Sequence, residues 1–282
     1  MYKALYVDVV RDLYKATGNK VPRKFISTLN DIHDKQEPHV RAFLLDWFKK
    51  YRTSLKRRLT QSLAKADDEE QRIRAAVKAA MGDVAAQFPD LFESVVQDVV
   101  DNITSLGVTP DFHLVNQRVQ VYLRNDAANY FTTLSNDEVA GIHSAIADAM
   151  ASDERYTMRS VIGTILDNGV VYSGNRQYDP VDWAAIVART ETARAASTAQ
   201  RESLQDVGLQ SWQWQVQDTG CDDCDENDDQ IVAMGDEFDS GDDAPPAHPN
   251  CRCVCIPVMD ELTSLDDSGG NSDDPEDDNA IE

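Results

Sequence analysis

A set of metal-ligand residues near the end of the chain constrains its fold more than any other feature. A Cys-x-x-Cys turn carries Cys221 and Cys224, and the string HPNCRC supplies His248, Cys251 and Cys253. The two thiolates of a tight turn can reach one ion, and a second group brought back by the chain can complete a tetrahedral set. The sequence therefore predicts a Zn²⁺ site that holds a small structural element together.

Five candidate ligands compete for the four positions around a tetrahedral ion. We expect Cys221, Cys224 and His248 to bind it together with either Cys251 or Cys253, because side chains two apart in an extended segment point in opposite directions. A structural site is closed by four protein ligands, whereas a catalytic site keeps an open position and needs a general base. The pattern favours a structural metal.

Cysteine count and hydropathy argue against two other classes of protein. Five cysteines in 282 residues are too few, and odd in number, for a disulfide scaffold, although disulfide pairing is the alternative to metal binding. No apolar run reaches the length of a membrane-spanning helix, and residues 1–12 carry charges where a signal peptide would be apolar. We expect a soluble protein of about two domains, made inside the cell.

Negative charge is concentrated at the end of the chain. The formal net charge is -23, yet residues 1–201 hold 26 basic and 26 acidic side chains, and residues 202–282 hold 24 acids and one base, Arg252. Such an acidic segment repels nucleic acid unless cations or a basic partner screen it. Residues 259–282 contain few apolar side chains, so we expect them to form a disordered acidic tail.

Helical periodicity dominates the first two hundred residues. Pro38 is expected to begin an amphipathic helix near residues 38–66, in which apolar side chains recur at steps of three or four. Its outer face is expected to carry the basic side chains Lys49, Lys50, Arg52, Lys56, Arg57 and Arg58. This face could contact DNA or another anionic partner, and an ordinary solvated helix surface is the alternative.

Local signals place several further elements. The acids at 67–70 favour a helix start, and residues 135–138 have the form of an N-cap with a glutamate at the third position. Asp179 and Pro180 open a helix that ends near Gly208. The alternation at 211–216 predicts a strand, and residues 254–258 could form a short returning strand.

These segments predict a mainly α protein in three parts. Residues 1–108 form an elongated helical N-terminal region in this interpretation. Residues 109–258 form a helical domain with a small β module, stapled by zinc, at 211–258, and the tail at 259–282 follows. Motifs of the common enzyme classes are missing: there is no phosphate loop, no G-x-S-x-G, no H-E-x-x-H and no dinucleotide fingerprint.

One combination of motifs resembles a known family. The helix motif ARTETAR at 188–194 is followed by a Trp-containing strand, Cys221-x-x-Cys224 and HPNCRC at 248–253. Over roughly residues 110–258 this order is similar to that of the phage Mu protein F-like, or minor head morphogenesis, family of tailed bacteriophages. Family members usually carry a glycine soon after the Cys-x-x-Cys turn, where this chain has acidic residues at 225–229.

The resemblance implies a role in the virus particle. It implies a low-copy minor capsid protein, located in the virion and in the host cytoplasm during assembly, that binds the portal protein, the major capsid protein or both. Packaged DNA would be a further contact, and no membrane is involved. Residues 1–108 would supply the docking region, and the work would be head assembly, DNA packaging or genome delivery.

Three polar residues of the 188–194 motif have two interpretations. Arg189, Glu191 and Arg194 could form a buried structural network that joins their helix to the metal module, and this is the interpretation we favour. The alternative is a metal-dependent hydrolase in which Glu191 or Asp218 acts as a base beside the ion. A zinc-containing nucleic-acid-binding protein is the other rival. No second histidine or nucleophile accompanies Glu191, so no catalytic residue is assigned and we do not expect an enzyme.

Overall fold

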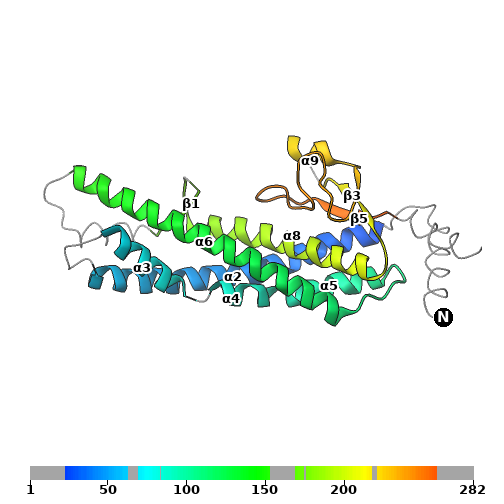
Figure 1. Ribbon diagram of the computed structural model, residues 1–282, viewed down its shortest axis with the longest axis horizontal. Helices are drawn as coiled ribbons and strands as arrows, with labels where there is room; N and C mark the ends of the chain where they lie inside the picture. The colour runs from blue at the N-terminus through cyan, green and yellow to red at the C-terminus, as the bar shows by residue number, and fades with distance from the viewer. Residues whose placement is uncertain are drawn as a thin grey trace, which may run out of the picture.

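A computed structural model describes residues 23–62, 69–82, 84–152, 169–174, 176–217 and 221–258. It shows an elongated bundle of long helices with a small β module on one side (Figure 1). The prediction of a mainly helical protein with a small β element is confirmed. Residues 1–22, the acidic tail and Asp218 lie outside the described residues.

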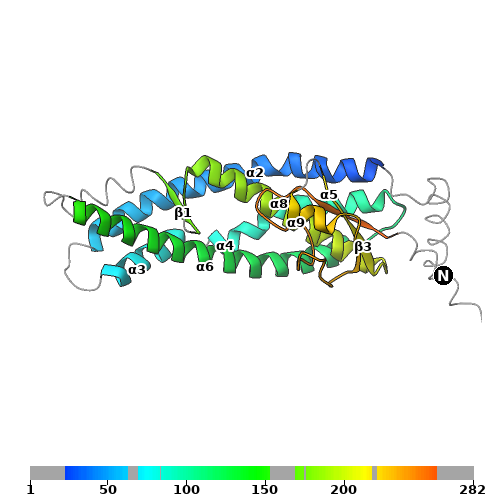
Figure 2. The ribbon, with the colours of Figure 1, turned by 90° about the horizontal axis from the view of Figure 1, so that it is seen from above.

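Three long helices form the bundle: α2 (Arg23–Ser62), α6 (Phe112–Ser152) and α8 (Pro180–Asp206). Shorter elements pack along them: α3 (Glu69–Met81), α4 (Val84–Gln87), the 3-10 helix η1 (Phe88–Phe92) and α5 (Glu93–Thr104). Seen from above, α2 and α6 run along opposite edges, and α8 and the β module lie between them (Figure 2). At 1.5 Å per residue, α2 and α6 are each about 60 Å long.

Pro38 lies inside α2, so the prediction that it begins the helix is wrong. A proline inside a helix removes one backbone hydrogen bond and crowds the preceding turn. Burial offsets that cost here, because Phe25 and Leu29 before the proline and Val40 and Leu44 after it are all almost fully buried. One continuous apolar side of the helix therefore extends across Pro38.

Residues 135–138 do not begin a helix either, because α6 runs through them. Their carboxylates bind a hairpin of β1 (Val171–Ser173) and β2 (Arg176–Tyr178), which the sequence did not predict. Glu138 accepts a hydrogen bond from the backbone N–H of Tyr172 at 2.9 Å, and Asp137 accepts one from that of Gly174 at 2.7 Å. A Cβ on Gly141 would overlap the Tyr172 ring, so this glycine lets the hairpin lie directly on α6.

One apolar core runs through the bundle. It contains buried residues from α2, α3, α5, α6 and α8, such as Leu55, Ile73, Val99, Val119 and Ala188. Helices from both sides of residue 108 thus contribute to the same core, and α8 packs against both α2 and α5. The division of the chain at 108 stays a prediction about functional regions.

The β module is a three-stranded antiparallel sheet. Its central strand β3 (Ser211–Gln215) pairs on one side with β4 (Ile231–Ala233) and on the other with β5 (Val254–Pro257). A short helix, α9 (Asp222–Asn227), connects β3 to β4. Strands β3 and β5 confirm the predicted strands, whereas β4 and α9 were not predicted. Of the helices in the described part of the chain, none is both apolar and long enough to cross a membrane.

Candidate metal centre

The first pair of cysteines is held by α9. Cys221 occupies the position before the first turn of this helix, in an extended backbone conformation, and Cys224 follows within the helix. Residues three apart at a helix start face the same direction. The Sγ of Cys224 is buried toward the module core, where Trp214 and Phe238 lie with ring centroids 5.0 Å apart.

The second group lies on the loop that leads into β5. Cys251 donates its backbone N–H to the carbonyl of His248 at 3.1 Å, which closes a turn around Asn250 at φ 66°. His248 Nδ1 lies 2.9 Å from the carbonyl oxygen of Pro249. Because a carbonyl can only accept, Nδ1 carries the proton and Nε2 offers its lone pair to the cysteines.

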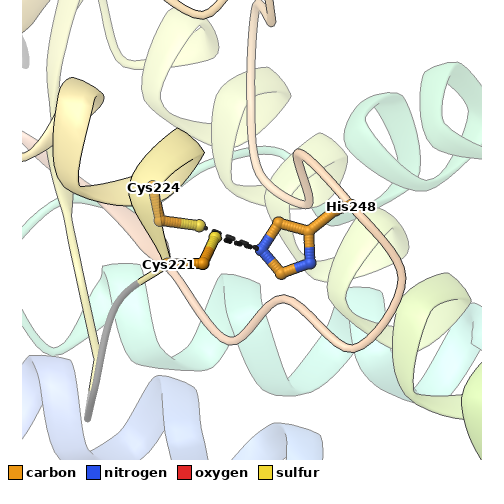
Figure 3. Close-up of side chains that lie close together, drawn as sticks. All are labelled: Cys221, Cys224 and His248. Carbon is orange, nitrogen blue, oxygen red and sulfur yellow. Dashed lines mark hydrogen bonds between the residues drawn. The ribbon is translucent and has the colours of Figure 1, made fainter.

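The two groups meet around Cys224. His248 Nε2 lies 3.0 Å from the Sγ of Cys221 and 3.1 Å from that of Cys224 (Figure 3). The Sγ atoms of Cys224 and Cys251 lie 3.8 Å apart. In a tetrahedral zinc site two sulfurs are roughly 3.8 Å apart, and a sulfur and a nitrogen roughly 3.5 Å apart. The cluster could therefore hold a metal ion after adjustments of about half an ångström.

Cys251 and Cys253 lie on the same side of the chain, so the expectation that they point apart is wrong. Their ligand atoms and that of Cys224 lie within 4.8 Å of one another. The alternation rule applies to a strand, and β5 begins only at Val254. Cys255 lies inside that strand, is fully buried and belongs to neither group of ligand atoms.

The thiols of the cluster differ in their affinity for protons. A hydrogen bond from Cys253 lowers the pKa of Cys251 to about 5, and the same bond raises the pKa of Cys253. Burial raises the pKa of Cys224 to about 12. The hydrogen bond to Pro249 is the main cause of a raised pKa at His248. Of Cys224, Cys251 and Cys253, Cys251 thus has the strongest thiolate character, and loading the site with a metal would release protons from the other two.

Arg189 connects the module to the bundle. Its guanidinium lies 3.3 Å from both carboxylate oxygens of Glu37 on α2, and it donates to the side chain of Asn250 at 3.3 Å. Asn250 in turn donates its backbone N–H to the hydroxyl of Thr190 at 3.2 Å. The loop that carries His248 and Cys251 is therefore held directly against α8.

Glu191 and Arg194 belong to a different contact. Arg194 pairs with Glu191 and with Asp126 on α6, each at 3.4 Å, and burial raises the pKa of Glu191 to about 7. The predicted network of three residues is thus divided between two faces of α8. The contacts of Glu191 lie toward α6, so its geometry offers no support for a base beside the metal cluster.

The predicted basic face of α2 is only partly exposed. Lys49, Lys50, Lys56 and Arg57 are exposed, and Arg58 is half-buried. Arg52 is buried: it donates to the carbonyl of Val170 at 3.2 Å and lies over the Phe48 ring. Its expected place on the outer face is therefore wrong, because the hairpin covers this position.

The sequence analysis did not identify Glu138 as a buried acid. Glu138 is 1% exposed and accepts a hydrogen bond from the hydroxyl of Tyr51 at 3.0 Å in addition to that from Tyr172. Burial raises its pKa to about 7. The signal was present, because Glu138 lies four residues from both Leu134 and Ile142 on the buried side of the helix.

Comparison with known proteins identifies the second half of the structure. Residues 140–256 match the family model described as phage Mu protein F like protein. This segment is a phage Mu protein F-like domain. The match begins within α6, includes the hairpin, α8 and the Cys/His cluster, and ends in β5, so it confirms the resemblance based on the HPNCRC string. No curated protein and no solved structure matches the chain.

The family indicates a phage head morphogenesis protein. It is a family of structural head proteins, in agreement with the expectation that the chain is not an enzyme. It also indicates contacts with other capsid components and a place in the virion.

Proposed function

We propose that this protein is a minor head protein that binds the portal protein or the inner surface of the capsid and assists head assembly, DNA packaging or genome delivery. The observation that carries this proposal is the family match over 140–256, which includes both the metal cluster and the helix that supports it. In this proposal the protein acts through protein–protein contacts. Such a role accords with a site that consists of candidate metal ligands and the side chains that hold them in place, rather than of a general base beside an open coordination position.

The metal in this proposal is a structural Zn²⁺. The strands of the module have three to five residues, and its core consists of two tryptophans, one phenylalanine and four cysteines. So small a sheet buries too little apolar surface to be stable on its own and needs a staple. An ion bound by Cys221 and Cys224 on one arm and His248 on the other would join the two connections that flank β4.

Cys251 is our proposed fourth ligand. Its Sγ lies at the tetrahedral sulfur–sulfur spacing from that of Cys224. Cys253 would then donate a hydrogen bond to the bound Cys251 thiolate, and such outer contacts orient metal ligands in other zinc sites. Arg189 would hold the loaded loop on α8, while Glu191 and Arg194 would fix α8 to α6.

The docking surface in this proposal includes the module. The module stands out from the side of the bundle, over α8 and toward the end where α2 begins (Figure 1). Its exposed edge carries Ile231, whose exposed fraction is 57%, among acidic side chains of α9 and the following loop. A rigid, stapled edge of this kind would suit one defined neighbour in the capsid.

Crosslinking mass spectrometry on purified particles tests the proposal. We expect the chain at a few copies per particle, with crosslinks to the portal or the major capsid protein from residues of the module. Particles that carry Cys221→Ser provide the comparison, and Cys255→Ala, which alters a buried cysteine outside the cluster, provides the matched control. Absence of the chain from both particles and their precursors would overturn the proposal.

A further inference from the structure

Strand β4 is an edge strand of the sheet in the module. It pairs with β3 on one side, and none of the strands in the described part of the chain pairs with its other side. The carbonyl of Gln230 and the N–H of Met234 make hydrogen bonds on the β3 side, at 3.0 Å and 2.7 Å. Backbone groups alternate between the two sides of a strand, so those of Ile231 and Ala233 point away from β3. We call this side of β4 the open edge.

Three backbone groups of the open edge are available for pairing. The carbonyl of Ala233 accepts a hydrogen bond from the N–H of Asp236 at 2.9 Å. Within the residues that the structure describes, no hydrogen bond reaches the N–H of Ala233 or either backbone group of Ile231. A further strand, parallel or antiparallel, could pair with these three groups.

The side chain of Ile231 lies beside these groups and is exposed. Its exposed fraction is 57%, and it is paired across the sheet with Gln213, so it lies on the face opposite to the buried tryptophans of β3. Strand β5, at the other edge of the sheet, is buried and contacts α2 and α8. Strand β2 of the hairpin exposes polar side chains, Arg176 and Gln177. The open edge thus combines available backbone groups with an exposed apolar side chain.

Hydrogen bonds between the residues before and after β4 fix the conformation of the strand. Asn227, which is fully buried, donates to the hydroxyl of Ser240 at 2.7 Å and accepts from its N–H at 3.0 Å. Gln230 forms a second reciprocal pair with Asp239, whose N–H donates to the Gln230 side chain at 3.1 Å. An edge that is ordered before binding loses less conformational entropy when another strand is added to it.

The surroundings of the open edge are strongly acidic. Residues 221–258 contain eleven acids and one base, Arg252, and this base pairs with two carboxylates on α2. Asp236 and Glu237 directly follow the strand, are exposed, and have no ion pair among the described residues. Opposite charges on neighbouring strands stabilise their pairing, and like charges oppose it. The edge therefore favours a basic strand and disfavours the equally acidic edge of a second copy.

We propose that the open edge of β4 binds an extended, basic segment of a partner protein as an added strand. This inference rests on the proposed role in protein–protein contact and adds the chemistry of the partner. An apolar side chain of that segment would lie beside Ile231, and lysines or arginines on either side of it would lie near Asp229 and Asp236. Main-chain hydrogen bonds would hold the segment, and the charges would select it.

Peptide binding by the purified full-length chain tests the proposal. The probe is a labelled nonapeptide in which lysine and valine alternate, and the comparison peptide carries glutamate in place of lysine. In fluorescence anisotropy we expect the basic peptide to bind about tenfold more tightly than the acidic one, or better. Hydrogen exchange of residues 230–234 should become several-fold slower when the basic peptide is bound.

Ala233→Pro is the variant that tests strand addition. It removes an outward N–H and leaves the bonds to β3, since proline is accepted on an edge strand. We expect it to weaken binding about tenfold, with unchanged tryptophan fluorescence of the module. Ile231→Thr keeps a β-branched side chain and should weaken binding several-fold. Val121→Thr, at a similarly exposed position of α6, is its control and should bind as the parent does.

A pair of substitutions tests the charges separately. Asp236→Asn together with Glu237→Gln should weaken binding of the basic peptide several-fold at low salt, and the difference should narrow in about 0.5 M salt. Glu93→Gln together with Asp101→Asn, which neutralises two exposed acids of α5, is the matched control and should have no effect.

Several results would overturn the proposal. They are equal binding of the two peptides, equal binding by Ala233→Pro and the parent, and no binding at about 1 mM peptide. Self-association of the parent that Ala233→Pro abolishes would assign the edge to a second copy instead. Self-association that appears only after the charges at 236 and 237 are removed, without peptide binding, would show that the acids only protect the edge.

The peptide experiment and the particle experiment can fail independently. A chain that is crosslinked to capsid components in particles but binds neither peptide would contradict the added strand and leave the proposed function intact. A chain that binds the basic peptide through β4 but is absent from particles and their precursors would contradict the proposed function.

Discussion

The helical bundle and the β module are stabilised in different ways. The bundle buries a continuous row of aliphatic and aromatic side chains, from Phe25 at one end of α2 to Leu59 at the other. The core of the module is small, and four of its seven buried residues are cysteines. Apolar burial stabilises the bundle, whereas the proposed Zn²⁺ would stabilise the module by bonds to its cysteines and histidine. Under the proposed function, one chain combines a metal-independent scaffold with a metal-dependent attachment.

The largest expected effect comes from removing two ligands. Cys221→Ser together with Cys224→Ser should reduce bound zinc from about one equivalent to none and unfold the module, because apparent binding energies in zinc-finger peptides reach about 10–16 kcal/mol. Metal analysis, tryptophan fluorescence of Trp212 and Trp214, and limited proteolysis measure this. Far-ultraviolet circular dichroism should change little, since the bundle stays folded. Cys255→Ala is the control and should retain the metal. A double variant with an unaltered melting profile would contradict a structural metal.

A core substitution in the bundle tests the other side of the comparison. Leu55 is fully buried, so Leu55→Ala should lower the free energy of unfolding by about 2–5 kcal/mol through lost burial and a cavity. Chemical denaturation followed by circular dichroism measures the loss. Zinc content and the protease resistance of the module should remain as in the parent. Loss of the metal together with the helical signal would show that the two regions unfold as one unit.

The two regions should respond to pH in opposite directions. Glu138 has a pKa of about 7 in the folded protein against an ordinary value of 4.5, so the folded state binds more protons than the unfolded state between these values. The stabilisation is complete below about pH 4.5 and is lost as pH rises through 7, by on the order of 3 kcal/mol. The module should instead lose its metal as its ligands are protonated in acid.

Denaturation at pH 5.5 and pH 8 measures the first response. Glu138→Gln keeps groups that can bond Tyr51 and Tyr172 and removes the charge, so it should flatten the pH dependence and be the more stable protein at pH 8. Glu191, whose pKa burial also raises to about 7, contributes in the same direction, and Glu191→Gln is the parallel variant. An unchanged slope in Glu138→Gln would contradict the assignment.

The smallest expected effect concerns the junction between the regions. Arg189→Gln removes the contacts to Glu37 and Asn250 and should cost about 1 kcal/mol, because the Arg189 side chain is 33% exposed. Hydrogen exchange should become faster in the loop 248–253, with the zinc content unchanged. Arg124→Gln, which removes an exposed pair between α6 and Asp90 of η1, is the control. Equal exchange in both variants would show that the junction depends on other contacts.

Sequence rules that consider only neighbouring residues were correct where neighbouring residues determine the structure, as at the start of α8. Asp179 accepts a hydrogen bond from the N–H of Val181 at 2.8 Å and begins α8 as its sequence indicated. The same rules were wrong at Pro38 and at residues 135–138, because burial of one long apolar side kept α2 and α6 continuous. The hairpin was missed because Glu138 and Gly141, distant in sequence, receive it.

The candidate site was predictable in its residue types and less so in its geometry. The spacing of Cys221 and Cys224, and the HPNCRC string, identified the residues that the structure brings together. The relation between Cys251 and Cys253 depends on where β5 begins, which residue patterns locate only to within a few positions. Residues that hold the site in place, such as Glu37 and Thr190, come from distant parts of the chain and carry no motif.

The continuity of α2 through Pro38 has a mechanical consequence. The first half of this helix holds the module through Asn30 and Asp34, and the second half holds the hairpin through Arg52. Pro38 cannot donate a hydrogen bond to the carbonyl of residue 34, so α2 bends more easily near Pro38, close to where the module is attached. A force applied to the module would therefore bend α2 at Pro38 before it displaced the second half of the helix.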